Sequence, residues 1–468
     1  MASHGTPKHS KFHTTSRLYA VLNWNYILCP LTLLPVYYCL RRLAGITYWV
    51  VVPPDNSRDW TTAAHLAITV LCLVSQFPPY AVLLGMCLPL RPFSNKQGPK
   101  WRKFRSLRVC LVTKGTNFEV PYPFSGSFRV MLSVQTVIHS ASHWNSISHP
   151  KVEFHVVADG ESGPRFEGAL PSYVHIDNVP NSFQSKKAKY KARALEYFRQ
   201  TQALTKDDWV LHLDEESEAD AYAIQSCLDF IERGTGDVAI GTIFYNGANH
   251  WSNALLSAAE AMRIADAFGR FQLPVRLFQR PLLGWMHGSW NLINGAVENN
   301  VTWDTDCIAE DFWFAYEAAA LGHKFGWLHA VVREQPPCTI QDFFRQRRRW
   351  YTGILSIESF IVKFMVSMSI ASAAVGLILP VYGLFGYPVP VPNWYFHWVL
   401  FNDAVHVHGL VAASVMQDMT MTEIQWVDVA LNALKTVLLS PVIHIMQAAA
   451  LVSSWVQPSR GFKIIEKI

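Results

Sequence analysis

The chain has 468 residues, of which half are apolar and only 16% are charged, and its formal net charge is +5. A soluble domain typically carries about 25% charged residues, so the composition argues against a wholly soluble protein and indicates that part of the chain lies in lipid. The eight cysteines are scattered without a CxxC pair, which argues against a disulfide framework or a zinc site.

Two long apolar segments, Leu18–Leu40 and Ala63–Leu90, lie in the first part of the chain. Each reaches the ~20 residues that a helix needs to cross a bilayer. The first is followed by Arg41 and Arg42 and lacks a clear small-residue cleavage site, so it does not resemble a cleaved signal peptide. We therefore expect residues 1–100 to form a membrane hairpin of two transmembrane helices and a basic linker.

A run of basic residues, with no acid among them, follows the second apolar segment. Basic residues beside a transmembrane helix favour the cytosolic side, and their place next to an apolar segment makes a nucleic-acid surface the weaker interpretation. We expect the following domain to face the cytosol and to have no nucleic-acid partner. The run comprises Arg91, Lys96, Lys100, Arg102, Lys103, Arg105 and Arg108.

Residues 101–356 alternate short β-like runs with amphipathic ones, which predicts an α/β domain with a mostly parallel sheet. Roughly 250 residues are enough for one such domain with its own core. The predicted strands are Val109–Thr113, Val152–Ala158, Tyr173–Ile176, Trp209–Leu213 and Val238–Phe244. The predicted helices are Phe128–His139, Lys187–Gln200, Ala221–Ile231 and Asn253–Ala267.

Three of the predicted strands end in polar groups: Thr113-Lys114-Gly115, Asp159-Gly160 and Asp214-Glu215-Glu216. In mostly parallel sheets ligands collect beyond the carboxyl ends of the strands, so we expect one ligand site there. Side chains at i and i+2 of an extended segment point the same way, so Asp214 and Glu216 can share a divalent cation that also binds a diphosphate. An acidic loop or helix start remains the alternative.

Two further residues are candidates for nucleotide contacts. Asp159 can accept hydrogen bonds from a base or ribose, although Asp-Gly after a strand is often only a turn. Lys191 lies at the start of a predicted helix, within a run of basic residues, and can contact a phosphate or ribose. A solvated surface lysine is the alternative.

Glu310 and Asp311 precede an amphipathic stretch, FWFAYEAAALG. Either carboxylate can serve as a general base that removes a proton from an acceptor hydroxyl, whereas a helix cap is the alternative. The segment Gly288-Ser-Trp-Asn contains Trp290 and Asn291 as candidates for lining an acceptor pocket, with a plain turn as the alternative.

The segment QRRRW runs from Gln346 to Trp350. Arginine makes bidentate contacts to phosphate and tryptophan offers a flat face to a sugar, so Arg349 and Trp350 are candidates for contacts to a donor and an acceptor. A cytosolic positive cluster beside the membrane is the alternative, above all for Arg347 and Arg348.

Three apolar segments follow, so residues 357–468 are expected to form interfacial or transmembrane helices and a short basic tail. Three crossings would leave the basic tail outside the cytosol, in conflict with the positive-inside rule. Lys363 makes an interfacial or re-entrant first segment a reasonable solution. The segments are Phe360–Phe385, Trp394–Met416 and Val429–Trp455.

The order of these motifs resembles family 2 glycosyltransferases, the membrane group with a GT-A catalytic domain that includes cellulose, chitin and hyaluronan synthases. Its D, DxD, (T/E)ED and QxxRW pattern matches Asp159, Asp214-Glu215-Glu216, Glu310-Asp311 and Gln346-x-x-Arg349-Trp350. The segments VTKG (112–115), KARALEYF (191–198), DDWVLHLDEES (207–217), AEDFWFA (309–315) and QRRRWYTGIL (346–355) are similar to the Egghead family of β-1,4-mannosyltransferases.

This resemblance implies a Rossmann-like GT-A domain that transfers mannose, with inversion, from GDP-mannose to the 4-hydroxyl of glucosylceramide or a related glycolipid. It implies Mg²⁺ or Mn²⁺ as cofactor and a multipass protein of the endoplasmic reticulum or Golgi membrane. The implied catalytic residues are Asp311 and Glu310, with Asp214 and Glu216 as metal ligands. The implied donor contacts are Thr113, Lys114, Gly115, Asp159, Lys191, Asp214, Glu215, Gln346, Arg349 and Trp350.

The chain departs from the wider family in two places. Glu216 stands where the polysaccharide synthases have Asp, and Pro121–Ser127 lacks the acidic loop usual in the Egghead group, which leaves the acceptor less certain than the chemistry. Two other functions remain open: a processive polysaccharide synthase, and a transporter or scaffold without catalysis, for which ionisable residues such as Asp403 within an apolar segment are the main argument.

Overall fold

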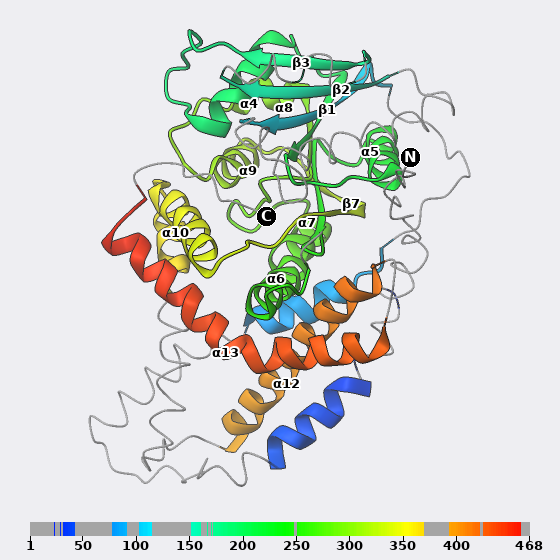
Figure 1. Cartoon of the computed structure of the whole chain (residues 1–468), viewed down its shortest axis with the longest axis vertical. Helices are drawn as coiled ribbons and strands as arrows, with labels where there is room; N and C mark the ends of the chain where they lie inside the picture. Colours follow the sequence, from blue (N-terminus) through cyan, green and yellow to red (C-terminus); the bar gives the residue numbers. More distant parts are fainter. Residues whose placement is uncertain are drawn as a thin grey trace, which may run out of the picture.

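The computed structural model describes residues 23, 29, 31–42, 77–90, 103–114, 151–160, 166, 170, 172–247, 250–368, 393–421 and 425–459. Figure 1 shows an α/β domain above a group of apolar helices. Gly115, Phe128–His139 and Pro121–Ser127 lie outside the described residues, as do the C-terminal basic residues and parts of three apolar segments. The tail residues concerned are Arg460, Lys463 and Lys467.

A seven-stranded sheet with the order β3-β2-β1-β4-β6-β5-β7 forms the centre of the domain. Only β6 runs antiparallel to its neighbours, so the predicted mostly parallel sheet is confirmed. The strands are β1 Ser106–Thr113, β2 Val152–Asp159, β3 Val174–Val179, β4 Asp208–Asp214, β5 Val238–Phe244, β6 Asn291–Asn294 and β7 Phe325–Arg333.

The predicted strands therefore correspond to β1 to β5, and β5 has the predicted bounds. The sequence analysis missed β6 and β7. β6 has four residues, all of them buried, so it shows no alternation between apolar and polar positions.

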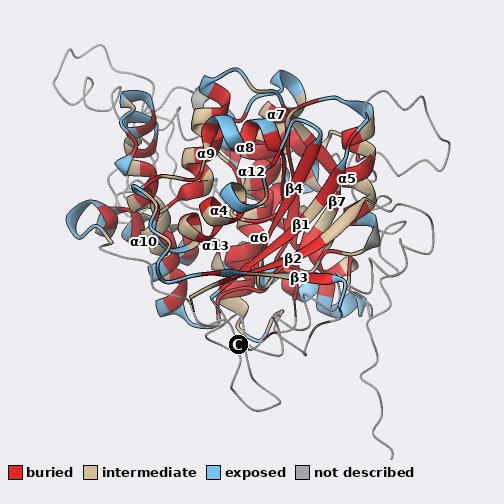
Figure 2. Ribbon diagram, turned by 90° about the horizontal axis from the view of Figure 1, so that it is seen from above, coloured by how far each residue is buried: buried red, intermediate tan, exposed pale blue. Residues whose placement is uncertain are grey.

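Helices connect and cover the strands. α4 packs on β1, β2 and β3, whereas α5 packs on β7. Figure 2 shows that the central strands are largely buried, whereas β3 at one edge of the sheet is partly exposed. The helices are α4 Tyr190–Thr201, α5 Ala221–Arg233, α6 Ala254–Asp266, the π-helix η2 Ala267–Gln272, α7 Leu273–Phe278, α8 Gly295–Val301, α9 Glu310–Ala320 and α10 Ile340–Ser356.

Polar side chains fix the starts of several helices. Asp220 accepts a hydrogen bond from Ala223 N at the start of α5, and Asn253 does the same for Leu255 N at the start of α6. Thr339 Oγ1 accepts from Asp342 N and donates to Asp342 Oδ2 (2.6 Å), which fixes the start of α10. These caps explain why α5, α6 and α10 begin where they do, and the starts of α5 and α6 lie within one residue of the predicted helices.

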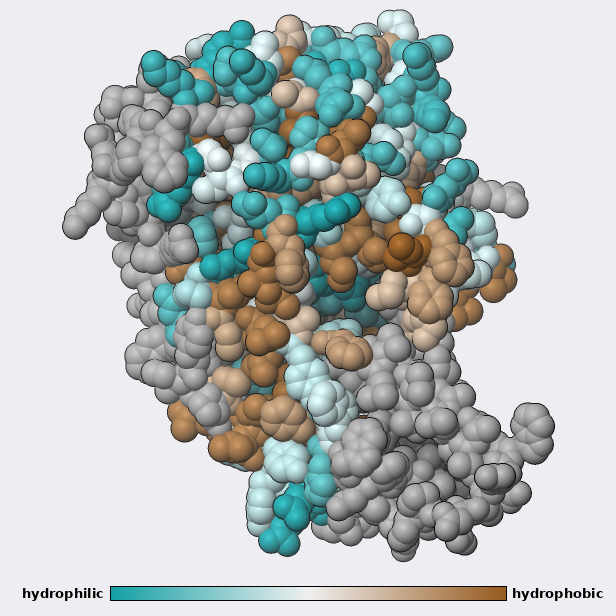
Figure 3. Space-filling model, turned by 180° about the vertical axis from the view of Figure 1, so that it is seen from behind, coloured by the Kyte–Doolittle hydropathy of each residue, from teal (hydrophilic) through white to brown (hydrophobic). Residues whose placement is uncertain are grey.

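Two described helices are long and apolar enough to cross a membrane, judged by length and composition alone: His397–Met419 and Trp426–Val456. They correspond to α12 (Asn393–Met419) and α13 (Trp426–Val456), the second and third of the predicted C-terminal segments. The first of those segments is described only as far as residue 368. Seen from behind, much of the described surface in this lower half of the molecule is apolar (Figure 3).

Helix α6 connects the sheet to these apolar helices, since it contacts β5 as well as α12 and α13. The helical segment Phe77–Met86 lies against η2, where glycines on both sides permit a close approach. A Cβ on Gly85 would lie 2.0 Å from Phe268 O, and one on Gly269 would lie 2.7 Å from Val82 N. The wider turn of the π-helix therefore coincides with a tight contact between the N-terminal apolar helix and the domain.

Candidate active site

The polar strand ends predicted to form a ligand site are adjacent in the sheet. β1 lies between β2 and β4, and its Val112 pairs with Asp214 while its Thr113 pairs with Ala158. Asp159 and Asp214 therefore lie on either side of the end of β1. Three parallel strands thus deliver their carboxyl ends to one edge of the sheet.

Lys191 links two of the predicted acidic groups. Its ammonium group, on α4, forms an ion pair with Asp214, donates a hydrogen bond to Gly288 O (2.5 Å) and lies 3.8 Å from Glu310 Oε1. Burial lowers the pKa of Lys191, but Asp214 and Glu310 outweigh it, so the net pKa is raised. Lys191 is therefore a charged, partly buried partner of these acids rather than a solvated surface lysine.

The acidic pair begins helix α9, where Glu310 is buried and Asp311 is partly buried. The N-cap residue of α9 is Ala309, which makes no side-chain cap, and Glu310 lies near Lys191 instead. Asp311 Oδ1 accepts a hydrogen bond from Phe312 N (2.8 Å). Burial raises the pKa of Glu310 to about 7 against the opposing effect of Lys191, and burial also raises the pKa of Asp311. A carboxylate whose pKa is raised holds a proton more readily than an ordinary exposed one does, which suits a proton acceptor.

Gly288 marks the point where these groups converge. A Cβ at this residue would lie 3.3 Å from Asp311 Oδ2, 3.6 Å from Asp214 Oδ2 and 3.7 Å from Lys191 Nζ. The next residue, Ser289, accepts a hydrogen bond from Asp214 N through Oγ (3.1 Å). Because Gly288 has no side chain, two carboxylates and one ammonium group can approach this point of the backbone closely.

The structure corrects the expectation that Trp290 and Asn291 line an acceptor pocket. Both are at most 1% exposed, Trp290 packs against Gly241, and Asn291 Nδ2 donates to His287 O (2.5 Å). These side chains belong to the core because the segment turns into β6 at this point. Gly288 and Ser289, which the sequence analysis did not single out, are the residues of this segment that face the acids.

The QRRRW segment lies on α10, and its residues face different partners. Burial lowers the pKa of Arg349, while Glu310, Asp311, Asp214 and Glu216 act to raise it, so Arg349 lies in the field of all four carboxylates. Gln346 is buried, and its Oε1 accepts from Arg347 Nη1 (3.1 Å).

Arg347 is also buried and pairs with Glu260. The alternative of a solvated membrane-flanking cluster is therefore wrong for Arg347. Its partner lies 87 residues earlier in the chain, on α6.

A second group of contacts surrounds Asp159. This carboxylate forms an ion pair with Arg193 on α4, and Arg193 Nη2 also donates to Pro180 O (2.6 Å). Burial raises the pKa of Asp159, and Arg193 and Lys114 oppose that effect. Nearby, Thr113 Oγ1 donates to Glu215 Oε2 (2.7 Å). Arg193 was part of the basic run in the sequence, but only its contact with Asp159 distinguishes it from its neighbours.

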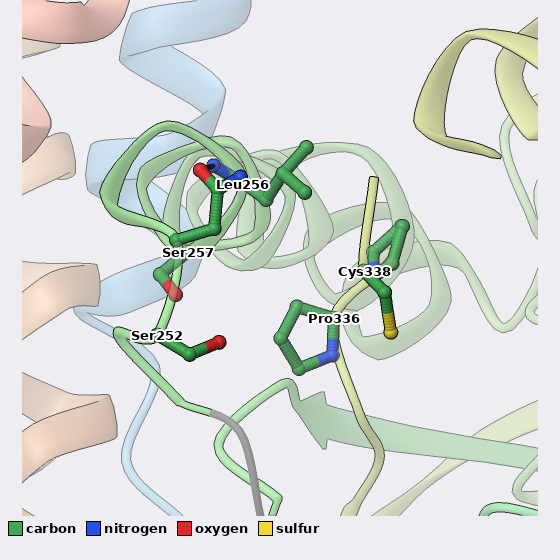
Figure 4. A pocket seen from close by; sticks show the side chains of 7 residues that line it. Ser252, Leu256, Ser257, Pro336 and Cys338 are labelled. Atoms are coloured by element: carbon green, nitrogen blue, oxygen red, sulfur yellow. Dashed lines mark hydrogen bonds between the residues drawn. The ribbon is translucent and has the colours of Figure 1, made fainter. Parts of the chain in front are cut away.

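The acids include hard oxygen donors of the kind that Mg²⁺ and Mn²⁺ prefer. Among the described residues, however, no group of three or more His, Cys, Asp or Glu side chains is arranged to hold a metal ion. Asp214 and Glu216 would thus supply only part of a coordination sphere. A cavity of about 200 Å³ lies elsewhere, bordered by Ser252, Ser257, Pro336 and Cys338, and includes none of the acids (Figure 4).

Comparison with known proteins identifies this part of the chain. The family model described as glycosyl transferase family group 2 matches residues 209–420. This part of the chain is therefore similar to that glycosyltransferase family. The mixed, mostly parallel α/β sheet is the architecture expected of its GT-A domain, so the predicted fold class is confirmed.

The chain is also Egghead-like in sequence. It is 36% identical over 306 residues to the β-1,4-mannosyltransferase bre-3 of Caenorhabditis elegans, covering 63% of this chain and 62% of that protein. It is 29% identical over 246 residues to the β-1,4-mannosyltransferase egh of Drosophila melanogaster, covering 50% and 53%. The matched region thus spans less than two thirds of each of these relatives.

Solved structures show a weaker similarity. A mannosyltransferase from Pyrobaculum calidifontis in complex with GDP-Man and Mn²⁺ has 13% identity and a TM-score of 0.42, covering 85% of this chain and 97% of that one. Glucosyl-3-phosphoglycerate synthase from Mycobacterium tuberculosis, with Mn²⁺ and UDP, has 14% identity and a TM-score of 0.34, covering 54% and 78%. No residue correspondence follows from similarity at this level.

Proposed function

We propose that this chain is a membrane-associated β-1,4-mannosyltransferase that transfers mannose from GDP-mannose to the 4-hydroxyl of the glucose in glucosylceramide, with inversion. One observation carries the proposal: the side chains of Asp214, Asp311 and Lys191 converge beside Gly288. Asp214 is suited to bind a cation that also holds a diphosphate, and Asp311 is suited to take a proton. The two carboxylates lie close together beside Gly288. The choice of mannose rests on the names of the related proteins.

Asp311 is the proposed general base. Its Oδ1 is held by Phe312 N, while its Oδ2 faces the space beside Gly288. There Oδ2 would accept the proton of the acceptor hydroxyl as that oxygen attacks C1 of mannose from the face opposite the diphosphate. The bond between C1 and the phosphate oxygen breaks, and GDP leaves with the electron pair. A single displacement of this kind inverts the configuration at C1.

Lys191 and Arg349 are proposed to stabilise charge around the donor. Both are partly buried cations in the field of carboxylates, and a bound diphosphate would provide further negative charge for them to offset. Glu310 would tune this balance, because its protonation removes one negative charge beside Lys191.

Asp214 and Glu216 are the proposed metal ligands. Two carboxylates together with phosphate oxygens and waters are a usual set for Mg²⁺ or Mn²⁺, so the donor's diphosphate would complete the coordination. When bound, the cation would offset the charge that develops on the departing GDP. We expect metal and nucleotide to bind cooperatively for this reason.

The nucleoside part of the donor is assigned to the edge formed by β1 and β2. Asp159 with Arg193, and Thr113 with Glu215, form two hydrogen-bonded pairs there, and exposed Lys114 adds a positive charge. A nucleoside diphosphate could exchange contacts with these pairs as it binds. Trp350 and Gln346, on α10, complete the proposed donor and acceptor site.

A lipid-linked acceptor suits the surroundings of the proposed base. Phe312 directly follows Asp311. It packs in an apolar cluster with Ile354 of α10, with Leu451 of α13 and with Val362. The cluster connects the start of α9 to a helix that is apolar and long enough to cross a membrane. An acceptor sugar on a membrane lipid would reach Asp311 without leaving the bilayer surface. We further propose that the enzyme works at the cytosolic face of the endoplasmic reticulum or Golgi membrane; the basic run after the second apolar segment supports the cytosolic side.

The direct test is a transfer assay with the full chain in nanodiscs that contain glucosylceramide. Radiolabelled GDP-mannose, UDP-glucose and UDP-N-acetylglucosamine are each supplied with Mg²⁺ or Mn²⁺. We expect label only from GDP-mannose, in one lipid product that is one sugar longer than the acceptor. Label from a UDP-sugar would contradict the donor, and a polymer would indicate a processive synthase.

A further inference from the structure

We infer that Glu260, a buried acid on α6, is a positioning residue that sets the orientation of Trp350 in the acceptor part of the site. The inference rests on the proposed function in one respect, namely that Trp350 contacts the acceptor. The arrangement around Trp350 is a property of this structure.

Glu260 holds two arginines at once. Its Oε1 accepts a hydrogen bond from Arg347 Nη2 (2.7 Å), and its Oε2 accepts one from Arg263 Nη1 (3.2 Å). Glu260 is fully buried, and the side chain of Arg347 is 4% exposed. Because each carboxylate oxygen is used by a different guanidinium group, the acid fixes the two arginines relative to each other.

Both arginines lie over the indole ring of Trp350. The Cζ atoms of Arg347 and Arg263 are 4.2 Å and 4.5 Å from the ring centroid. A guanidinium group over an indole is attracted by the ring's negative face, so the two contacts hold the ring in one orientation. Trp350 itself is only partly buried, which leaves part of its surface available to a ligand.

The same arginines are fixed by other aromatic rings. Arg263 also lies 4.2 Å from the ring of Tyr245, which follows β5, and Arg347 lies 4.6 Å from the ring of Phe343. Trp350 is thus connected through Glu260 to the sheet and to α6, which packs on α12 and α13. Arg349, on the same turn of α10, is in the field of the four carboxylates. Glu260 bonds directly to the two arginines that lie over Trp350 and reaches Arg349 only through the backbone of α10, so a change in its contacts should affect Trp350 more than the acidic site.

A buried ion pair is weak grounds for inferring stability, because the cost of removing charges from water offsets most of their attraction. Such a group has its clearest value in holding a unique arrangement of side chains. Two arginines that share one acid and one indole fit that role. The inference is therefore about the orientation of Trp350, and it predicts an effect that loss of stability alone would not produce.

The test uses the full chain labelled with 5-fluorotryptophan, and ¹⁹F NMR in detergent micelles. The Trp350 resonance is the one missing from the Trp350→Phe protein. Glu260→Gln keeps the shape of the side chain but removes its charge, so we expect this resonance to shift or broaden. Glu260→Asp keeps the negative charge, so its Trp350 resonance should lie closer to that of the unaltered chain than the resonance of Glu260→Gln does. Glu196→Gln, which changes an acid that is 2% exposed and paired with Arg199 on α4, should leave it in place.

Transfer kinetics provide the second measurement. Glu260→Gln should raise KM for the lipid acceptor about tenfold or more while kcat changes less than threefold, since the base is untouched. An unchanged Trp350 resonance in Glu260→Gln would overturn the inference. An equal rise in the acceptor KM in the Glu196→Gln control would also overturn the inference, because it would show a general structural effect.

The two proposals fail differently. The Trp350 resonance could shift in Glu260→Gln although the unaltered chain transfers no mannose. That result would contradict the proposed function but leave the positioning role of Glu260 intact. If Glu260→Gln does not fold, Glu260→Asp and Arg263→Met keep the question open to measurement. An unchanged Trp350 resonance in both of these folded variants would also overturn the inference.

Discussion

Lys191 forms an ion pair with Asp214 and lies 3.8 Å from Glu310 Oε1, so one buried ammonium group joins the end of β4 to the start of α9. The two acids are 96 residues apart in the sequence, and the contact depends on α4 lying across the sheet edge. Removing either acid would leave the positive charge of Lys191 less well compensated by nearby negative charge. The charges of these three residues are therefore the property to test.

Replacing Asp214 by Asn should weaken metal-dependent nucleotide binding. The amide keeps the shape of the side chain but removes the charge proposed to bind the cation, so GDP affinity in Mn²⁺ should fall at least about tenfold. Titration with a fluorescent GDP analogue, with Mn²⁺ and with EDTA, measures this. Asp229→Asn, in an exposed ion pair on α5, is the matched control. Equal affinity in Asp214→Asn and in the unaltered chain would remove Asp214 as a metal ligand.

An added methyl group at Gly288 should block the proposed reaction space without unfolding the domain. The new Cβ would lie 3.3 Å from Asp311 Oδ2 and 3.6 Å from Asp214 Oδ2, both ends of side chains that can adjust slightly. Transfer by Gly288→Ala should fall roughly 10- to 100-fold, with little change in the melting temperature. Rates and thermal unfolding are measured on the same preparation. Transfer at the normal rate would show that substrates bind elsewhere.

Glu310 should make the stability of the metal-free protein depend on pH. Burial raises the pKa of Glu310 from 4.5 to about 7, so the folded state binds this proton more tightly than the unfolded state does. The stabilisation is fully present below pH 4.5 and is lost as the pH rises through about 7. In EDTA, Glu310→Gln should therefore melt at a higher temperature than the unaltered chain at pH 8, with a smaller difference at pH 5. Glu317→Gln on the same helix is the control, and an equal difference at both pH values would contradict the shift.

The close contact between Phe77–Met86 and η2 predicts an effect far from the site. In Gly85→Ala the new Cβ would lie 2.0 Å from Phe268 O, and a backbone atom cannot move aside as a side chain does. We expect a loss of about 1–3 kcal/mol in stability, measured by thermal unfolding in detergent. The control is Gly409→Ala on α12, whose Cβ would meet only a methyl group of Val82 at 3.1 Å. Similar stabilities for the two variants would show that the segment does not pack against η2 in this way.

Much of the fold could be predicted from the sequence because its signals are local. Val238–Phe244 is a continuous apolar run, and the structure has β5 with the same bounds. The start of α6 is set by Asn253, a residue type that favours this position. β6 could not be found in this way, because its four buried residues acquire strand geometry only by pairing with β4 and β5.

The candidate site was only partly predictable for the same reason. Motif order brought Asp214 and Asp311 to attention, and the structure brings both to the space beside Gly288. Trp290 resembled a residue of a surface turn, and only the long-range packing against Gly241 shows that it belongs to the core. Arg347 resembled a membrane-flanking charge, whereas its function in the structure depends on Glu260, far away in the sequence.

The most direct test of the account compares transfer by the unaltered chain and by Asp311→Asn. The substrates are radiolabelled GDP-mannose and glucosylceramide in nanodiscs. Loss of the proposed base should lower the rate by about 10²–10⁴-fold while GDP binding and the melting temperature stay the same. Glu317→Gln, on the same helix, should retain the normal rate. A single β-linked mannosyl lipid formed by the unaltered chain and nearly absent with Asp311→Asn is the result we predict. Comparable rates for the two proteins, or no mannose transfer by either, would contradict the account.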